Sequence, residues 1–185
     1  MSVLARMRPA AVCGLRAASA LAAFASAAWA ADDQRWRIFE QDGGALLSPS
    51  HSDEATDDVG SPSFRCKAKS GTIAVTGDAG QELRNAVADL LRSNGYPQVE
   101  MVPASRFGQA LLSVSYSEAG SVWEYSFELE ADAPAFDAFK RSGRLTFKVG
   151  KTVVREEFKA GLENVAKFQS ICARPKWAAP DIFES

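Results

Sequence analysis

The side chains best suited to chemistry in this chain are its carboxylates. They occur in pairs at Glu156-Glu157 and at Glu128 with Glu130. Two carboxyls that face each other across a cleft about 5–10 Å wide can act as general acid and base on a glycosidic bond. Both pairs fall on strand-like runs, however, where charged side chains normally point to solvent. The sequence therefore favours solvated surface charges over catalytic groups.

A second cluster, consisting of His51, Asp53, Glu54, Asp57 and Asp58, contains side chain types that bind cations. The regular D-x-[DN]-x-[DN]-G spacing of a calcium loop is missing. A zinc site normally requires more than one His or Cys ligand. We interpret the cluster as a solvated acidic loop, and we predict no metal or other cofactor.

Other catalytic signatures are weak. Gly150-Lys151-Thr152 is similar to the end of a phosphate loop, but Leu145 stands where the upstream glycine is needed, so a hairpin turn is the better interpretation. The chain contains neither G-x-S-x-G nor S-x-x-K, and its single histidine, His51, lies in the acidic loop. We assign no catalytic residue, and a non-enzymatic protein is favoured over an enzyme.

Residues 1–30 have the profile of a secretory signal peptide. Three arginines precede an alanine-rich apolar run, no acidic residue occurs before Asp32, and Ala28-Trp29-Ala30 fits the small-x-small cleavage rule. A spanning helix needs about 20 apolar residues, and too few are present here. We expect a mature protein that starts at Ala31, has no membrane span and is periplasmic or secreted.

Cleavage would leave 18 basic and 23 acidic residues, a formal charge of −5. This balance disfavours nucleic acid and anionic membranes as main partners. A protein or another envelope component is the expected partner.

The best-defined element is a hairpin over residues 64–75. Phe64, Cys66 and Ala68 alternate with basic residues, Ser70-Gly71 supplies a turn, and a β-branched run returns. This alternation places Cys66 on the buried face.

Period-2 alternation predicts further strands, among them residues 112–116. The clearest is 123–129, with Trp123, Tyr125 and Phe127 on the core face. Helical spacing predicts helices over 81–93 and 161–172 and a shorter one between Pro134 and Gly143. Residues 48–61 are interpreted as a solvated connector. The pattern predicts a single α+β domain over 31–173, a mainly antiparallel sheet of hairpins with two or three helices on one face, followed by a tail at 174–185.

Cys66 and Cys172 are the two cysteines that remain after cleavage, because Cys13 leaves with the signal peptide. An even count in an exported chain predicts a disulfide. Such a bond would close a loop of about 100 residues and stabilise the fold by about 4–5 kcal/mol in the chain-entropy picture. No C-x-x-C motif occurs, so a redox role is not favoured.

Several short motifs resemble a family of small exported bacterial proteins of unassigned function. They are Phe64-Arg65-Cys66 before Ser70-Gly71, Tyr96-Pro97, Ser142-Gly143-Arg144-Leu145, and residues 161–168 followed by Cys172. The resemblance extends over most of residues 35–172. It implies that both cysteines are structural, and it brings no catalytic residues.

The sequence thus favours a non-enzymatic exported binding or interaction module, with its specificity in the acidic 48–61 loop or in the tail around Trp177. Such a module requires an exposed apolar patch or an edge strand free for pairing. The alternatives are a small carboxylate-based hydrolase and an inhibitor of a periplasmic enzyme.

Overall fold

The computed structural model describes residues 34–41, 43–52, 60–104 and 109–175, and these residues belong to one compact unit. The predicted signal peptide, the centre of the acidic loop and the tail from residue 176, including Trp177, lie outside the described residues.

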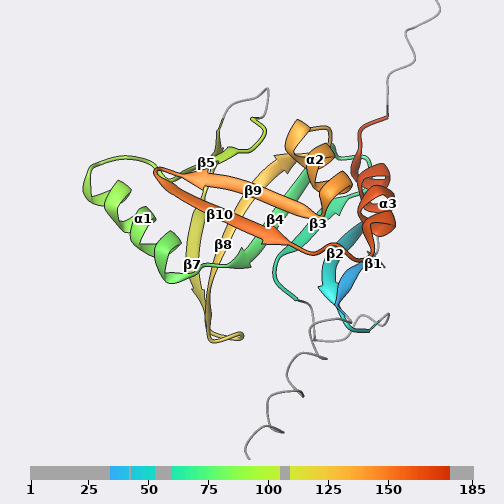
Figure 1. Ribbon diagram of the computed structural model, residues 1–185, viewed down its shortest axis with the longest axis horizontal. Helices are drawn as coiled ribbons and strands as arrows, with labels where there is room; N and C mark the ends of the chain where they lie inside the picture. Colours follow the sequence, from blue (N-terminus) through green and yellow to red (C-terminus); the bar gives the residue numbers. More distant parts are fainter. Residues whose placement is uncertain (1–33, 42, 53–59, 105–108, 176–185) are drawn as a thin grey trace, which may run out of the picture. The chain divides into compact units, whose positions relative to one another are not determined.

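Ten strands form two antiparallel sheets (Figure 1). The larger sheet, in spatial order, contains β1 (Arg35–Gln41), β2 (Gly44–Ser50), β3 (Ser63–Lys67), β4 (Thr72–Asp78), β8 (Val122–Glu130) and β7 (Ser113–Ser117). The smaller sheet contains β10 (Thr152–Glu157), β9 (Arg144–Val149), β5 (Gln98–Met101) and β6 (Ala110–Leu111). The helices are α1 (Gln81–Arg92), α2 (Pro134–Ser142) and α3 (Leu162–Cys172). The α+β fold with antiparallel sheets is confirmed, and its division into two sheets is a feature that the strand pattern did not indicate.

The core lies on one face of the larger sheet. Over β8 this face meets the smaller sheet, where the Phe147 ring lies 5.3 Å from that of Tyr125 and 5.0 Å from that of Phe127. Over β1 to β3 the same face is covered by α2 and α3, and the Trp36 ring lies 5.0 Å from that of Phe139. Figure 1 shows β9 and β10 crossing in front of β8 and β4, with α2 and α3 beside them. One sheet face is therefore covered by two different layers.

The disulfide joins the end of β3 to the end of α3. Cys66 and Cys172 are both buried, with their Cα atoms 5.7 Å apart. The turn between β3 and β4 adds two hydrogen bonds there. Lys69 N–H donates to Ile171 O, and Gly71 N–H donates to Cys172 O, each at 2.8 Å. These bonds satisfy carbonyls that the last turn of a helix leaves unpaired, so the hairpin both caps and covalently holds the closing helix.

Two sequence-based interpretations need correction. Residues 48–50 are not part of a solvated connector. They continue β2, and Ser48 and Ser50 are buried because their hydroxyls donate to Gly60 O at 2.8 Å and Ser52 O at 3.1 Å. The alternation predicts that Trp123 lies in the core together with Tyr125. Trp123 is instead 41% exposed, because the smaller sheet covers this face at Tyr125 but not fully at Trp123.

Candidate functional site

Among the described strands, β7 forms one edge of the larger sheet and pairs only with β8. On the far side of β8, the Trp123 carbonyl accepts a hydrogen bond of 2.6 Å from Ala79 N–H, just beyond the end of β4. Consecutive residues of a strand direct their backbone groups to opposite neighbours. Glu124, next to Trp123, therefore directs its groups to β7, where Ser115 is its partner.

The opposite edge of β7 is open. Just before β7, Leu112 N–H donates to Pro97 O at 3.0 Å, on the side away from β8. Alternate residues share that direction, so the N–H and C=O groups of Val114 and Tyr116 also point away from β8. Across the described part of the chain, no strand pairs with these four backbone groups.

The sequence of β7 contains nothing that would protect this edge. Natural edge strands commonly carry charges or proline, or are covered. β1 carries two arginines and a glutamate, and its Trp36 N–H donates to Ala160 O at 2.9 Å. β10 carries an arginine and two glutamates and contacts α1. β7, Ser-Val-Ser-Tyr-Ser, has neither a charge nor a proline.

An exposed aromatic pair lies at the end of this edge. Tyr116 is 51% exposed, and its ring lies 5.6 Å from that of Trp123 on β8. The Arg84 guanidinium of α1 lies 5.6 Å from the centre of the Trp123 ring, a cation–π distance that holds the indole in place. Tyr96 is 79% exposed and precedes Pro97, whose carbonyl accepts the hydrogen bond from Leu112 N–H. We call Tyr116 and Trp123, whose rings are in contact, the aromatic patch.

The outer face of the larger sheet is polar. Short hydroxyl side chains form a row across four strands, in which consecutive residues are register partners: Ser63, Thr76, Ser126 and Ser113. The next row contains Asp78, Glu124 and Ser115. An open groove of about 620 Å³ runs over Ser126 and Glu128 towards Leu111. Short residues beside acidic ones thus leave room for long side chains of a partner.

The structure does not bring the predicted carboxylate pairs into a catalytic arrangement. Strand alternation in β10 makes Glu156 half-buried and Glu157 exposed. Glu157 is paired with Arg144 at 2.9 Å and with Lys159 at 3.1 Å, and these two partners lower its pKa. Glu128 and Glu130 lie on the polar outer face of β8 and line the same groove. No cleft separates the members of either pair among the described residues.

Glu156 instead has a different neighbour. The buried Tyr125 hydroxyl donates to Glu156 Oε1 at 3.4 Å. The Tyr125 ring crosses Gly77, where any Cβ would overlap it. Burial, and then the charge of Asp78, raise the pKa of Glu156, while burial raises the pKa of Tyr125 far above its ordinary value. Asp78 and Glu156 line one groove of about 380 Å³ beside the start of α1.

The raised pKa predicts the direction of a pH effect. A carboxyl whose folded-state pKa is raised stabilises the fold below about pH 4.5, and this contribution is lost as pH rises through the folded pKa. Glu156→Gln is therefore expected to be more stable than wild type at pH 7, by less than about 1 kcal/mol because the carboxyl is partly solvated. Urea unfolding from pH 4 to 8 measures this.

Glu157→Gln is the matched control, because the lowered pKa of Glu157 predicts the opposite sign. Its wild-type contribution is present above about pH 4.5 and is lost as pH falls through the lowered pKa. Parallel pH profiles for wild type and Glu156→Gln would contradict the assignment of a raised pKa to Glu156.

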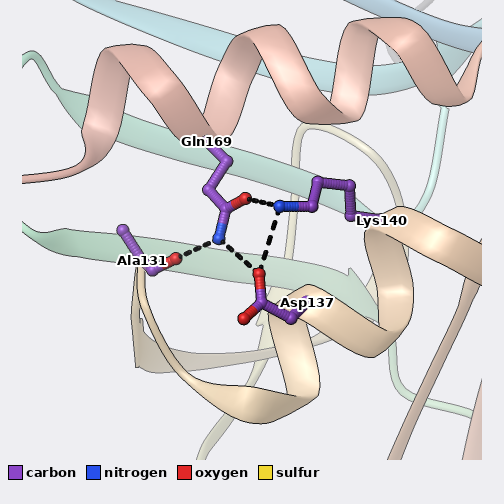
Figure 2. A network of polar contacts seen from close by, with 4 residues as sticks. All are labelled: Ala131, Asp137, Lys140 and Gln169. Carbon is purple, nitrogen blue, oxygen red and sulfur yellow. Dashed lines mark hydrogen bonds and ion pairs between the residues drawn. The ribbon is translucent and has the colours of Figure 1, made fainter.

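A closed polar network of the described residues joins α2 to α3 (Figure 2). Gln169 Nε2 donates to Ala131 O at 2.7 Å and to Asp137 Oδ1 at 3.1 Å, while its Oε1 accepts from Lys140 Nζ at 2.6 Å. The amide of Gln169, followed by Lys140, lowers the pKa of Asp137. Both the NH₂ group and the carbonyl oxygen of the Gln169 amide are hydrogen-bonded within the protein. We therefore assign the network a structural role.

Gln169→Leu is expected to lower the free energy of unfolding by about 2 kcal/mol, because the Ala131 carbonyl and the side chains of Asp137 and Lys140 lose their shared partner. Chemical denaturation measures the loss. Lys167→Gln on the same helix is the control, because it removes only an exposed ion pair with Glu40 and should change stability by less than about 0.5 kcal/mol. Equal losses in the two variants would contradict the structural role of the network.

Sequence reasoning identified residues 112–116 as a strand but did not identify it as an open edge. The signal that was present is the uncharged run from Ser113 to Ser117 in a chain in which 24% of the residues are charged. The centre of the predicted acidic loop, residues 53–59, and the tail around Trp177 lie outside the described residues.

No protein-family model, curated protein or solved structure matches this chain. The resemblance to small exported bacterial proteins therefore stays a prediction. Among the described residues, no helix combines the length and the apolar character needed to cross a bilayer, and no group of three or more His, Cys, Asp and Glu side chains is arranged to hold a metal ion.

Proposed function

We propose that this chain is an exported, non-enzymatic binding module that engages a protein or envelope component through β7 and the aromatic patch. The observation that carries the proposal is the open backbone edge of Val114 and Tyr116 beside the exposed ring pair of Tyr116 and Trp123. Exposed apolar clusters and unpaired edges are sites where proteins associate. A disulfide is consistent with an oxidising compartment, which supports the periplasm or the cell exterior as the place of action.

The test is capture of partners by the full chain, exported from a bacterial host and purified from the periplasm. Wild type is compared with Trp123→Ser, which removes a ring of the aromatic patch, and with Val153→Ser, which removes a similarly exposed apolar side chain from β10. A partner retained by wild type and Val153→Ser but lost by Trp123→Ser supports the proposal. The absence of any retained partner, or equal retention by all three proteins, would refute it.

A second candidate is a carboxylate-based hydrolase, favoured by one observation: Asp78 and the partly buried Glu156 line the same groove. The raised pKa of Glu156 suits a general acid. Hydrolysis of an envelope polysaccharide by wild type, abolished in Glu156→Gln but not in Glu157→Gln, would establish it. Inhibition of a periplasmic enzyme through an exposed loop, the other alternative from the sequence, stays a prediction.

A further inference from the structure

We infer that β7 accepts an extended segment of a partner polypeptide as an added strand, and that this segment alternates basic with apolar residues. The inference rests on the proposed binding function and specifies the chemistry of the partner.

The backbone supplies the first part of the argument. Val114 and Tyr116 direct two N–H donors and two C=O acceptors away from β8. These groups have the alternating arrangement that pairs with a neighbouring β-strand. An added strand would satisfy all four groups, which is the general mode of peptide recognition by sheet augmentation. Because β7 carries no charge or proline, nothing in its sequence opposes such pairing.

The outer face determines the charge of the partner. The outward side chains of β7 are Ser113, Ser115 and Ser117, all short. Behind Ser115 lies Glu124, and its carboxylate forms no ion pair within the described residues. A partner residue opposite Ser115 would stand about 10 Å from the Glu124 backbone, two strand spacings away. The long side chain of a lysine or arginine at this position can extend over Ser115 and reach the Glu124 carboxylate.

The inner face determines the alternate positions. Val114 and Tyr116 point to the same side as Tyr125 and Trp123, their register partners on β8. Partner residues on that side would contact the half-exposed Tyr116 ring, and apolar side chains gain most from such contact. Arg84 lies on this inner side, against Trp123, so a basic residue of the partner would be repelled there and not on the outer face.

Charge argues against a second copy of this chain as the occupant. Pairing of β7 with β7 of another copy would place the Glu124 rows of both chains on one continuous sheet. The chain has a formal charge of −2, and of −5 once the predicted signal peptide is removed. The net negative charge of each copy opposes their association, so a basic segment fits this edge better.

The experiment uses two blocked heptapeptides, one alternating lysine with valine and the other alternating glutamate with valine. Binding to the exported, disulfide-bonded protein is measured by fluorescence anisotropy at low and high salt. We expect the lysine peptide alone to bind. We expect Glu124→Gln to weaken its binding several-fold and high salt to weaken it further.

Proline variants test the backbone ladder. Val114→Pro removes an N–H that points away from β8 and that the fold itself does not use, so the variant should fold, as edge strands tolerate proline at such positions. It should weaken peptide binding about tenfold or more. Val114→Ala keeps the N–H and is the matched control, expected to bind within about threefold of wild type. Circular dichroism and the unfolding midpoint confirm that each variant is folded.

The outcomes separate this inference from the proposed function. A captured partner that Trp123→Ser loses but Val114→Pro keeps would leave the binding module standing and overturn strand addition. Equal binding of the two peptides, no binding of the lysine peptide, or wild-type affinity in Val114→Pro would also overturn it. A dimer in sedimentation analysis that disappears in Val114→Pro would show that a second copy takes the edge, against the inference.

Discussion

Replacing both Cys66 and Cys172 with alanine is expected to lower the free energy of unfolding by about 4 kcal/mol, a large share of the total of about 5–15 kcal/mol typical of a domain. The bond joins residues 106 positions apart, so in the chain-entropy picture its loss releases a long closed loop in the unfolded chain. The folded state loses less, because the Lys69 and Gly71 N–H groups still bind the last carbonyls of α3. Urea unfolding of both proteins measures the difference.

Reduction supplies the control for this prediction. Dithiothreitol should lower the unfolding midpoint of wild type to about that of the double variant, and it should leave the double variant unchanged. A loss of less than about 1 kcal/mol would mean that the hairpin and α3 are held together by packing and hydrogen bonds alone. The cysteines would then not be the main link between the first half of the chain and its last helix.

The helices and strands could be predicted from the sequence because each depends mainly on the pattern of residues within its own segment. Alternation in Tyr125, Phe127 and Leu129 marks a strand with one buried face, and all three side chains are buried. Gly143 ends α2 in the left-handed conformation that its position after the helical pattern indicates. The two cysteines remaining after the predicted cleavage meet, as their even number in an exported chain predicts.

The division into two sheets depends on pairings between distant residues. Glu100 of β5 pairs with Lys148 of β9, while residues 110–117 pair first with β5 and then with β8. An alternating strand has the same sequence pattern in either sheet. The open edge of β7 is equally invisible in the sequence, because a strand becomes an edge only when no other segment pairs with it.

Burial of polar residues was the other feature that composition could not show. Ser48 and Ser50 look like connector residues, yet carbonyls of Gly60 and Ser52 accept their hydroxyls and make their burial possible. Glu156 occupies an alternating strand like its neighbours, but the Tyr125 hydroxyl reaches it from the other sheet. In both cases the partner is supplied by tertiary structure, which a pattern of polar and apolar residues does not encode.

Gly143→Ala is expected to lower the free energy of unfolding by about 3 kcal/mol. The backbone of Gly143 has φ 69° and ψ 9°, which costs a residue with a Cβ about 1–2 kcal/mol. The new Cβ would also overlap the carbonyl oxygen of Phe158, whose own N–H donates to Gly143 O at 3.0 Å. Relief requires the segment after β10 to move away from the end of α2. Because Trp36 Nε1 donates to Phe158 O at 2.9 Å, that movement would reach the centre of the core.

Gly43→Ala separates the two causes. Gly43 has a similar φ of 75°, but beyond its chain neighbours no atom of the described residues lies within 4 Å of the Cβ that alanine would add. It should therefore show the backbone cost alone, about 1 kcal/mol. Chemical denaturation of both variants gives the difference, which measures how closely the chain at Phe158 packs against the end of α2. Equal losses of unfolding free energy in the two variants would show that the segment at Phe158 moves aside at little cost. The contact between α2 and the chain after β10 would then not be tightly packed.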